Sequence, residues 1–78
     1  MSKIIIYSTP ACVYCKMAKA FFLDQKIDYI EKDVVSDLKA QEEMIKKSGQ
    51  FGVPVIDVDG QIIIGFDKAK IVELLKLG

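Results

Sequence analysis

Residues 3–8 (KIIIYS) form a short run of β-branched and aromatic side chains that is apolar almost throughout. A strand of this composition is typical of the centre of a sheet, where both of its faces are covered. Pro10 then marks a turn, and residues 12–26 repeat apolar side chains at spacings of three and four, as an amphipathic helix does. The apolar positions of this predicted helix are Cys15, Met17, Ala18, Phe21 and Phe22, and the polar positions include Lys16, Lys19 and Asp24. The chain is therefore expected to begin with a buried strand that leads into a helix.

Residues 27–34 (IDYIEKDV) alternate apolar and polar side chains in part, which predicts a second strand. A second helix is expected after it. Ser36 is a residue type that caps helix N-termini, and we expect the helix to run from there to Lys47. Gly49 stands where a left-handed residue commonly ends a helix, so both ends of this segment carry a signal.

Residues 53–58 (VPVIDV) and 61–64 (QIII) are both strand-like, and Asp59-Gly60 lies between them. An Asp-Gly pair flanked by apolar runs is the strongest short-range signal for a β-hairpin. Asp67 then offers an N-cap for a last helix. The apolar face of that helix consists of Ile71, Leu74 and Leu75. The predicted order of elements is β-α-β-α-β-β-α.

No linker, repeat or low-complexity segment interrupts this order, so we expect residues 1–78 to form one α/β domain with a central sheet flanked by three helices. The first two strands are joined by a helix and should lie parallel through a right-handed crossover. The last two strands form a hairpin and should lie antiparallel. The predicted sheet is therefore four-stranded and mixed.

Charge and composition exclude several classes of partner. Hydrophobic residues make up 51% and charged residues 28% of the 78-residue chain, as in a folded soluble domain. Eleven basic and eleven acidic residues leave no net charge to hold nucleic acid or an anionic membrane. The N-terminal segment MSKIIIYS contains one lysine and a very short apolar run, which is too short for the core of a signal peptide or for a membrane span. We therefore expect a cytoplasmic protein that binds neither nucleic acid nor membrane, and we expect it to be a monomer.

Both cysteines of the chain, Cys12 and Cys15, lie three positions apart where the first strand meets the first helix. A disulfide across so short a loop stabilises a fold by only about 2 kcal/mol, and a structural zinc site needs about four Cys or His ligands. The chain has no histidine, which also excludes a Cys-His nucleophile of the protease kind. Two inert buried thiols would leave the C-x-x-C spacing unexplained. Thiol-disulfide chemistry is therefore the favoured function, and a metal or cluster site is the alternative.

The start of a helix favours an ionised cysteine, because unpaired backbone N–H groups and the positive end of the helix dipole stabilise a thiolate. We therefore expect Cys12 to be the nucleophile that attacks a substrate disulfide. Cys15 lies one turn further into the helix, so we expect it to remain a thiol and to resolve the mixed disulfide. Lys16 and Lys19 are expected to be solvated charges on the exposed helix face, without a catalytic role.

Three motifs together resemble the glutaredoxin family within the thioredoxin fold: CVYC at the start of the first helix, GVPV at the third strand and IGFD before the last helix. The resemblance covers essentially the whole chain. It implies a small thiol-disulfide oxidoreductase of the dithiol type, with a thioredoxin-like β-α-β-α-β-β-α fold. Such a protein carries electrons from a reductant to a protein disulfide or a glutathione mixed disulfide. It holds no bound cofactor and can use glutathione as a co-substrate.

The resemblance also implies a substrate-binding site around the two cysteines. Pro54 is expected to be cis and to lie against the active cysteine, which leaves the Val53 backbone to pair with an extended substrate segment. From the sequence alone, a trans proline at the start of an edge strand is the other interpretation. Tyr14 corresponds to the tyrosine that borders the glutathione site in relatives with C-P-Y-C, and its other interpretation is an exposed aromatic that covers the helix start.

The segment Ile64-Gly65-Phe66-Asp67 departs from the G-G-x-D that glutathione-using relatives carry. In those relatives, close backbone approach and the helix N-terminus hold the γ-glutamyl carboxylate. Gly65 and Asp67 are retained, whereas Ile64 and Phe66 replace small residues. Phe66 after Gly65 resembles the redoxins that take electrons from thioredoxin reductase and supply ribonucleotide reductase, and its other interpretation is a core plug under the last helix. We expect Gly65, Phe66 and Asp67 to bind substrate, with glutathione or thioredoxin reductase as the electron source.

Two further positions differ from the family pattern. Val13 replaces the commonest proline of C-P-Y-C, which removes a fixed φ from the first turn of the helix. Thr9 takes the place of a lysine that is often found upstream of the first cysteine. The Val13 replacement leaves the reduction potential open, and the missing lysine is a further departure from the glutathione-using relatives.

A metal-binding module is the alternative function for the same C-x-x-C. Copper chaperones also place this motif after a first strand, but their order of elements is β-α-β-β-α-β and ends on a strand. Here IVELLK ends the chain with a predicted helix, which argues against that class. A cluster that bridges two chains stays open at this point.

Overall fold

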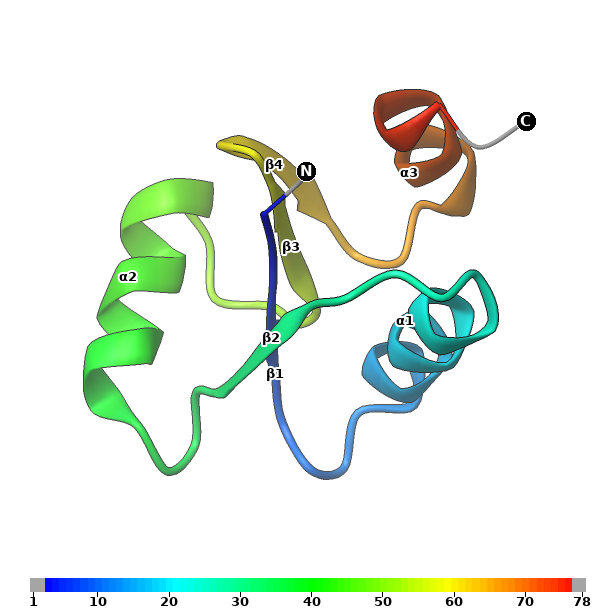
Figure 1. Cartoon of the computed structure of the whole chain (residues 1–78). Coiled ribbons are helices and arrows are strands. Elements are labelled where there is room, and N and C mark those ends of the chain that lie inside the picture. Colours follow the sequence, from blue (N-terminus) through cyan, green and yellow to red (C-terminus); the bar gives the residue numbers. More distant parts are fainter. Residues whose placement is uncertain (1–2, 77–78) are drawn as a thin grey trace.

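Strands and helices alternate through the computed structural model, which describes residues 3–76. The elements are β1 (Ile4–Ser8), α1 (Val13–Asp24), β2 (Ile30–Asp33), α2 (Leu38–Ser48), β3 (Val55–Val58), β4 (Gln61–Ile64) and α3 (Lys68–Leu75). This order is the predicted β-α-β-α-β-β-α, and one sheet contains the four strands (Figure 1). In this part of the chain, no helix is long and apolar enough to cross a membrane.

β1 lies inside the sheet, as its apolar sequence predicted, and all five of its residues are buried. The strand order is β2-β1-β3-β4, with β2 parallel to β1, and with β3 antiparallel to both β1 and β4. The predictions of a parallel first pair, an antiparallel hairpin and a mixed sheet are therefore confirmed. Asp59 and Gly60 have φ angles of 52° and 92°, as the tight turn of this hairpin requires.

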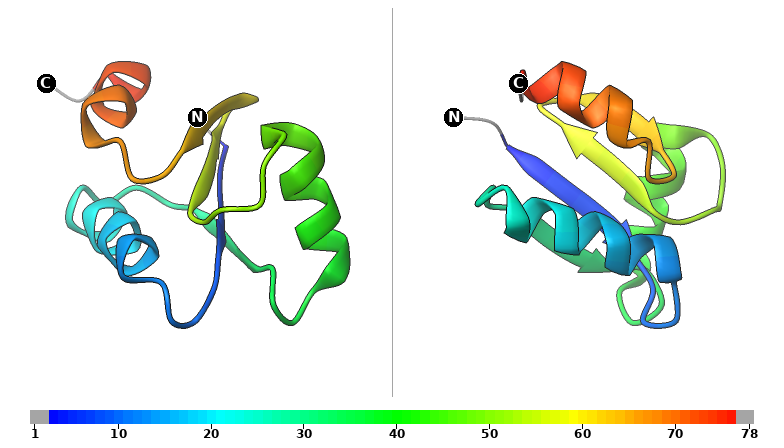
Figure 2. Two further views of the ribbon diagram at one scale, coloured as in Figure 1. Left: turned by 180° about the vertical axis from the view of Figure 1, so that it is seen from behind. Right: turned by 90° about the vertical axis from the view of Figure 1, so that its right-hand side faces the viewer.

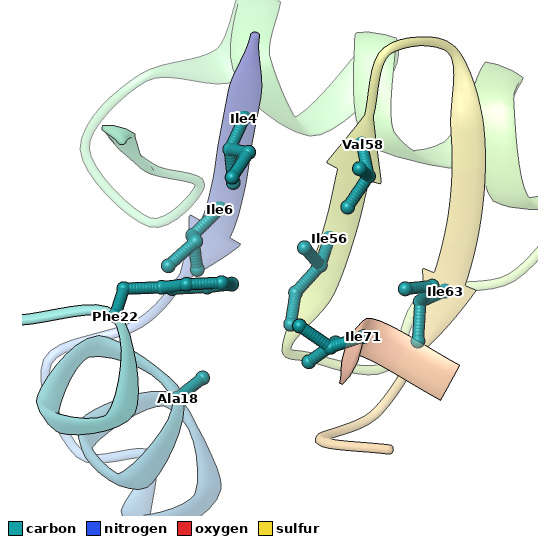
Figure 3. Close-up of a cluster of buried hydrophobic side chains, with 8 residues drawn as sticks. All are labelled: Ile4, Ile6, Ala18, Phe22, Ile56, Val58, Ile63 and Ile71. Carbon is teal, nitrogen blue, oxygen red and sulfur yellow. The ribbon is translucent and has the colours of Figure 1, made fainter. Parts of the chain in front are cut away.

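Helices α1 and α3 cover one face of the sheet, and α2 covers the other (Figure 2). Alternate residues of the central strands point to opposite faces, so the core divides into two apolar clusters. The cluster under α1 and α3, drawn in Figure 3, consists of Ile4, Ile6, Ala18, Phe22, Ile56, Val58, Ile63 and Ile71. The cluster under α2 consists of Ile5, Tyr7, Val34, Ala40, Met44 and Val55. Leu74 and Leu75 pack against the first cluster beside Ile71, as predicted.

α1 is shorter than the predicted 12–26. It begins at Val13, because Cys12 is its N-cap, and it ends at Asp24. Lys26 has a φ of 58°, in the left-handed region that a right-handed helix cannot continue through. The buried residues of α1 are Cys15, Ala18 and Phe22. The prediction that Met17 faces the core is wrong, since Met17 is 46% exposed. It lies two positions after the buried Cys15, which corresponds to a rotation of roughly 200° around the helix, so it points away from the core.

β2 spans Ile30–Asp33 instead of the predicted 27–34, and it is an edge strand with two exposed and two half-buried residues. β3 spans Val55–Val58 instead of the predicted 53–58. Pro54, which has no N–H to donate to a neighbouring strand, precedes its first residue. β4 has the predicted bounds, Gln61–Ile64.

The N-cap of α2 is Asp37, so the prediction of Ser36 is wrong. The Asp37 carboxylate accepts hydrogen bonds from the backbone N–H groups of Lys39 and Ala40, at 3.0 and 3.2 Å. A carboxylate caps a helix as well as a hydroxyl does, and its charge also complements the helix dipole. At the other end, Gly49 has a φ of 72° and closes the helix after Ser48, which confirms its predicted role.

Candidate active site

Cys12 is the N-cap of α1, and its backbone is extended (φ −86°, ψ 114°). Its sulfur accepts a hydrogen bond from the backbone N–H of Cys15 over 3.1 Å. The first N–H groups of a helix have no partner within the helix, so this bond satisfies one of them. The Cys12 N–H in turn donates to the Thr9 carbonyl over 3.3 Å, which closes the turn before the helix. The predicted position of Cys12 at the helix N-terminus is confirmed.

The two thiols differ sharply in exposure. Both are free in this structure; the Cys15 side chain is fully buried, whereas Cys12 is half-buried. Burial, together with the hydrogen bond to the Cys12 side chain, raises the pKa of Cys15 to about 12, although the Thr9 backbone acts in the opposite direction. Cys15 is therefore a thiol at neutral pH. Cys12 carries the sulfur that an incoming molecule can reach.

The peptide bond between Val53 and Pro54 is cis, as the family resemblance implied, while the expected contact of Pro54 with the active cysteine stays a prediction. Pro54 is buried, and its carbonyl accepts a hydrogen bond from the Gly65 N–H over 2.8 Å. Gly65 has a φ of 79°, a left-handed backbone conformation that residues other than glycine adopt only with strain. One hydrogen bond therefore joins the loop before β3 to the loop after β4.

A cleft with a volume of about 470 Å³ opens beside these two loops. It is lined by Tyr14, Val53, Pro54, Ile64, Gly65, Phe66, Asp67 and Lys68. The six residues that the sequence proposed for substrate binding all line it, and Ile64 and Lys68 complete the wall. Tyr14 lies between the two cysteines on α1 and is 62% exposed, so the cleft adjoins the helix start.

Ile64 and Phe66, the two bulky residues of the cleft, face different environments. Ile64 is 57% exposed, so its side chain occupies open space at the rim. Phe66 is half-buried, packs against the core cluster under α1 and α3, and lies with its ring centroid 5.9 Å from that of Phe21. Phe66 therefore packs as the core plug that was one of its two interpretations, and it also lines the cleft, while its role in substrate binding stays a prediction.

Asp67 is the N-cap of α3, as predicted, and its carboxylate accepts a hydrogen bond from the Lys70 N–H over 3.2 Å. Lys68 follows it, with its ammonium 5.4 Å from the centroid of the Phe21 ring. A cation over an aromatic face is attracted by the ring quadrupole. The end of the cleft at α3 therefore carries one anchored carboxylate and one ammonium.

A polar cluster that the sequence did not predict consists of Lys19, Glu31 and Ser8. The Lys19 ammonium lies 2.6 Å from a Glu31 carboxylate oxygen, and the Ser8 hydroxyl donates to the same oxygen over 2.9 Å. These hydrogen bonds lower the pKa of Glu31, and the bond to Glu31 raises the pKa of Lys19. The Lys19 side chain is only 25% exposed, so its prediction as a solvated surface charge is wrong, whereas Lys16 is exposed as expected.

A second charged cluster lies on the face covered by α2. The Lys47 ammonium donates to Asp57 over 2.6 Å and to the Tyr7 hydroxyl over 2.8 Å, and Tyr7 donates to Glu43. Burial alone would lower the pKa of Lys47, but its hydrogen bonds to Asp57, Tyr7 and Glu43 raise it. Lys32 also pairs with Glu43, at 3.1 Å. Across residues 3–76, no group of three or more His, Cys, Asp or Glu side chains is placed to hold a metal ion.

The chain is similar to known proteins along most of its length. The glutaredoxin family model matches residues 4–63. An uncharacterised glutaredoxin-like 8.6 kDa protein in the rubredoxin operon of Clostridium pasteurianum is 48% identical over 73 residues, which cover 94% of this chain and 97% of that protein. Glutaredoxin 3 of Escherichia coli K12 is 37% identical over 67 residues, which cover 86% of this chain and 81% of the relative.

The fold has an equally close match among solved structures. A crystallised variant of the thioredoxin-like protein BC3987 superposes with a TM-score of 0.92 at 29% identity, and the match covers both chains in full. The fold is therefore thioredoxin-like, with three helices around a four-stranded mixed sheet. The family model and the sequence relatives show that this chain belongs to the glutaredoxin family.

Proposed function

We propose that this protein is a dithiol thiol-disulfide oxidoreductase in which Cys12 attacks the substrate and Cys15 resolves the mixed disulfide. Membership of the glutaredoxin family supports redox chemistry at the C-x-x-C motif and favours it over a metal-binding module. The observation that carries the assignment of roles is the difference in burial between the two thiols. A substrate sulfur can reach Cys12 directly, whereas Cys15 is accessible only to the sulfur beside it.

The hydrogen bond at the helix start supports the attacking role of Cys12. A thiolate accepts a stronger hydrogen bond than a thiol does, and the Cys15 N–H already points at the Cys12 sulfur over 3.1 Å. The positive end of the α1 dipole acts in the same direction. Both effects stabilise Cys12 as a nucleophile and later as a leaving group.

The reaction consists of two thiol-disulfide exchanges. In the first, the Cys12 thiolate attacks one sulfur of the substrate disulfide, a mixed disulfide forms, and the other substrate sulfur leaves as a thiolate that takes up a proton. In the second, Cys15 loses its proton and attacks the Cys12 sulfur, the intramolecular disulfide forms, and the remaining substrate sulfur leaves and is protonated. The substrate gains two electrons and two protons, which a reductant must return to the protein.

The cleft supports proteins as substrates and thioredoxin reductase as a reductant that serves at least as well as glutathione. Ile64 stands at the rim in a position where glutathione-using relatives carry glycine, and its exposed side chain reduces the space for a γ-glutamyl group. An extended protein segment needs less depth, because it pairs through its main chain, with Val53 as the partner. A disulfide in a protein such as ribonucleotide reductase fits this description.

Two serine variants test the proposal. The oxidised wild-type protein is supplied with NADPH and thioredoxin reductase, and separately with NADPH, glutathione and glutathione reductase, and the reduction of a protein disulfide is followed. Cys12→Ser is expected to abolish the reaction. Cys15→Ser, reduced beforehand and assayed without glutathione, which would itself resolve the mixed disulfide, is expected to stop after the first exchange, so that mass spectrometry finds the substrate bound to Cys12. Retained activity in Cys12→Ser, or substrate bound to Cys15, would contradict the assigned roles.

A further inference from the structure

Three polar side chains from three different elements meet beside the first turns of α1. Lys19 comes from α1, Glu31 from β2 and Ser8 from the end of β1. One carboxylate oxygen of Glu31 accepts from both the Lys19 ammonium, at 2.6 Å, and the Ser8 hydroxyl, at 2.9 Å. Ser8 is almost completely buried, so its hydroxyl fixes the position of the carboxylate from inside the fold. The carboxylate in turn fixes the ammonium of Lys19.

The cluster lies next to the buried thiol. Lys19 is four residues after Cys15 on α1, and side chains at this spacing lie on the same helix face. Ser8 directly precedes Thr9, whose backbone interacts with the Cys15 sulfur. Because Cys15 is fully buried and Lys19 is three-quarters covered, water screens their interaction only in part. Lys19 lowers the pKa of Cys15, against the larger effect of burial, and Cys15 raises the pKa of Lys19.

We propose that Lys19, held in place by Glu31, is a positioning residue for the resolving step, where its ammonium stabilises the negative charge that Cys15 must acquire before it attacks. This inference rests on the proposed function, because it concerns the second of the two exchanges. Burial protects Cys15 from outside oxidants and from substrates, but the same burial opposes its ionisation. A positive charge held on the same helix face, four residues from Cys15, offsets part of that cost.

The step balances without any further reactant. Cys15 releases its proton, its sulfur attacks the Cys12 sulfur of the mixed disulfide, and the bond between Cys12 and the substrate breaks. The substrate sulfur leaves with the electron pair of that bond and takes up one proton, either the one that Cys15 released or one from solvent. Lys19 keeps its own proton throughout, since its bond to Glu31 holds the ammonium form.

Several charged groups set the field around this pair. Glu31 opposes the effect of Lys19 on Cys15, but it also prevents the flexible lysine chain from extending into water. The charge of Asp33 on β2 raises the pKa of Glu31, against the larger effect of its hydrogen bonds, and Tyr29 raises the pKa of Lys19. Cys12 acts on Cys15 directly and raises its pKa. The net effect of Lys19 is therefore expected to be moderate.

A chromogenic disulfide separates the two exchanges. One equivalent of dithiobis(nitrobenzoate), mixed rapidly with the fully reduced protein, releases one coloured thiolate when Cys12 attacks and a second when Cys15 resolves. Lys19→Gln is expected to slow the second release by about threefold to tenfold and to shift its pH profile upward, with the first release unchanged. Lys19→Arg keeps the charge and is expected to behave like the wild type. Lys16→Gln, which removes an exposed charge from the same helix, is the matched control and is expected to change neither phase.

The outcomes distinguish this inference from the proposed function. If Cys15→Ser still gives the first release and Lys19→Gln resolves with the wild-type rate and pH profile, the inference is wrong while the roles of the two cysteines stand. A variant that loses stability to urea without any change in the second release would likewise assign Lys19 a structural role only. If Cys15→Ser gives no first release, the proposed function itself fails.

Discussion

The backbone N–H of Cys15 donates to the sulfur of Cys12 over 3.1 Å, so the proposed resolving residue also contacts the proposed nucleophile. This contact is the N-cap interaction of α1. An N-cap side chain commonly meets the N–H of the third helical residue, and Cys12 and Cys15 occupy these two positions of α1. The donor is a backbone group that any residue except proline would supply at this position, and the cysteine adds a second sulfur about one helical turn from the first.

The N-cap of α2 predicts that substitutions at two neighbouring positions change the free energy of unfolding by different amounts. Asp37→Ala removes the carboxylate that accepts from Lys39 and Ala40, and it is expected to lower the free energy of unfolding by about 1 kcal/mol. Ser36→Ala is the matched control and is expected to change it by less than about 0.5 kcal/mol, because Ser36 is exposed and does not cap the helix. Urea denaturation of both variants measures the difference. The reverse order of effects would show that the cap had been assigned to the wrong residue.

The rim of the cleft predicts a change in the choice of reductant. Ile64→Gly restores the small residue of glutathione-using relatives, and it is expected to raise turnover with glutathione by about threefold to tenfold. Turnover with thioredoxin reductase is expected to stay the same or to fall. Ile30→Gly, which removes an exposed isoleucine from the other edge strand, controls for the loss of strand stability. Equal turnover of the wild type and Ile64→Gly with glutathione would show that the side chain does not obstruct the site.

The charged cluster under α2 predicts how stability depends on pH. A hydrogen bond from Tyr7 and pairing with Lys32 and Lys47 lower the pKa of Glu43 to about 2, from 4.5. The folded state therefore binds fewer protons at this site than the unfolded state does, and the stabilisation present at neutral pH is lost as the pH falls from about 4.5 to about 2.

The corresponding variant is Glu43→Gln. It is expected to be less stable than the wild type at neutral pH by about 1 kcal/mol, because the side chain is 35% exposed and solvent screens part of the interaction. The difference is expected to shrink below about pH 4.5. Glu42→Gln alters an exposed neighbour on the same helix and serves as the control. Urea unfolding over a series of pH values gives the comparison, and a difference that grows in acid would contradict the sign of this linkage.

The sequence predicted best those features that depend on residues close together in the chain. Asp59-Gly60 makes the hairpin turn, Gly49 ends α2 and Asp67 caps α3, because each of these signals acts within about four residues. The position of Cys12 at a helix start followed from the same kind of local pattern. The choice between Ser36 and Asp37 failed because both residue types cap helices and only the backbone geometry separates them.

The features that the sequence missed depend on how the strands align. Glu31 reaches Lys19 and Ser8 because β2 lies parallel to β1, with Glu31 paired to Ile6. The spacing of Cys15 and Lys19 was visible in the sequence, but nothing in it placed a carboxylate opposite that lysine. The same holds for Lys47 and Asp57, which meet only after α2 packs on the sheet. The six residues proposed to bind substrate were identified through the family resemblance, because they come from three separate segments that line one cleft only in the folded chain.

The central claim is that one of two neighbouring sulfurs is reachable and reactive while the other is buried and protonated, and alkylation measures this directly. Cys15→Ser leaves Cys12 as the only thiol, and Cys12→Ser leaves only Cys15. With iodoacetamide at neutral pH, Cys12 is expected to react at least about a hundredfold faster than Cys15, and the two rates are expected to converge in urea. Equal rates in the folded variants, or faster reaction of Cys15, would contradict the assignment of nucleophile and resolving thiol.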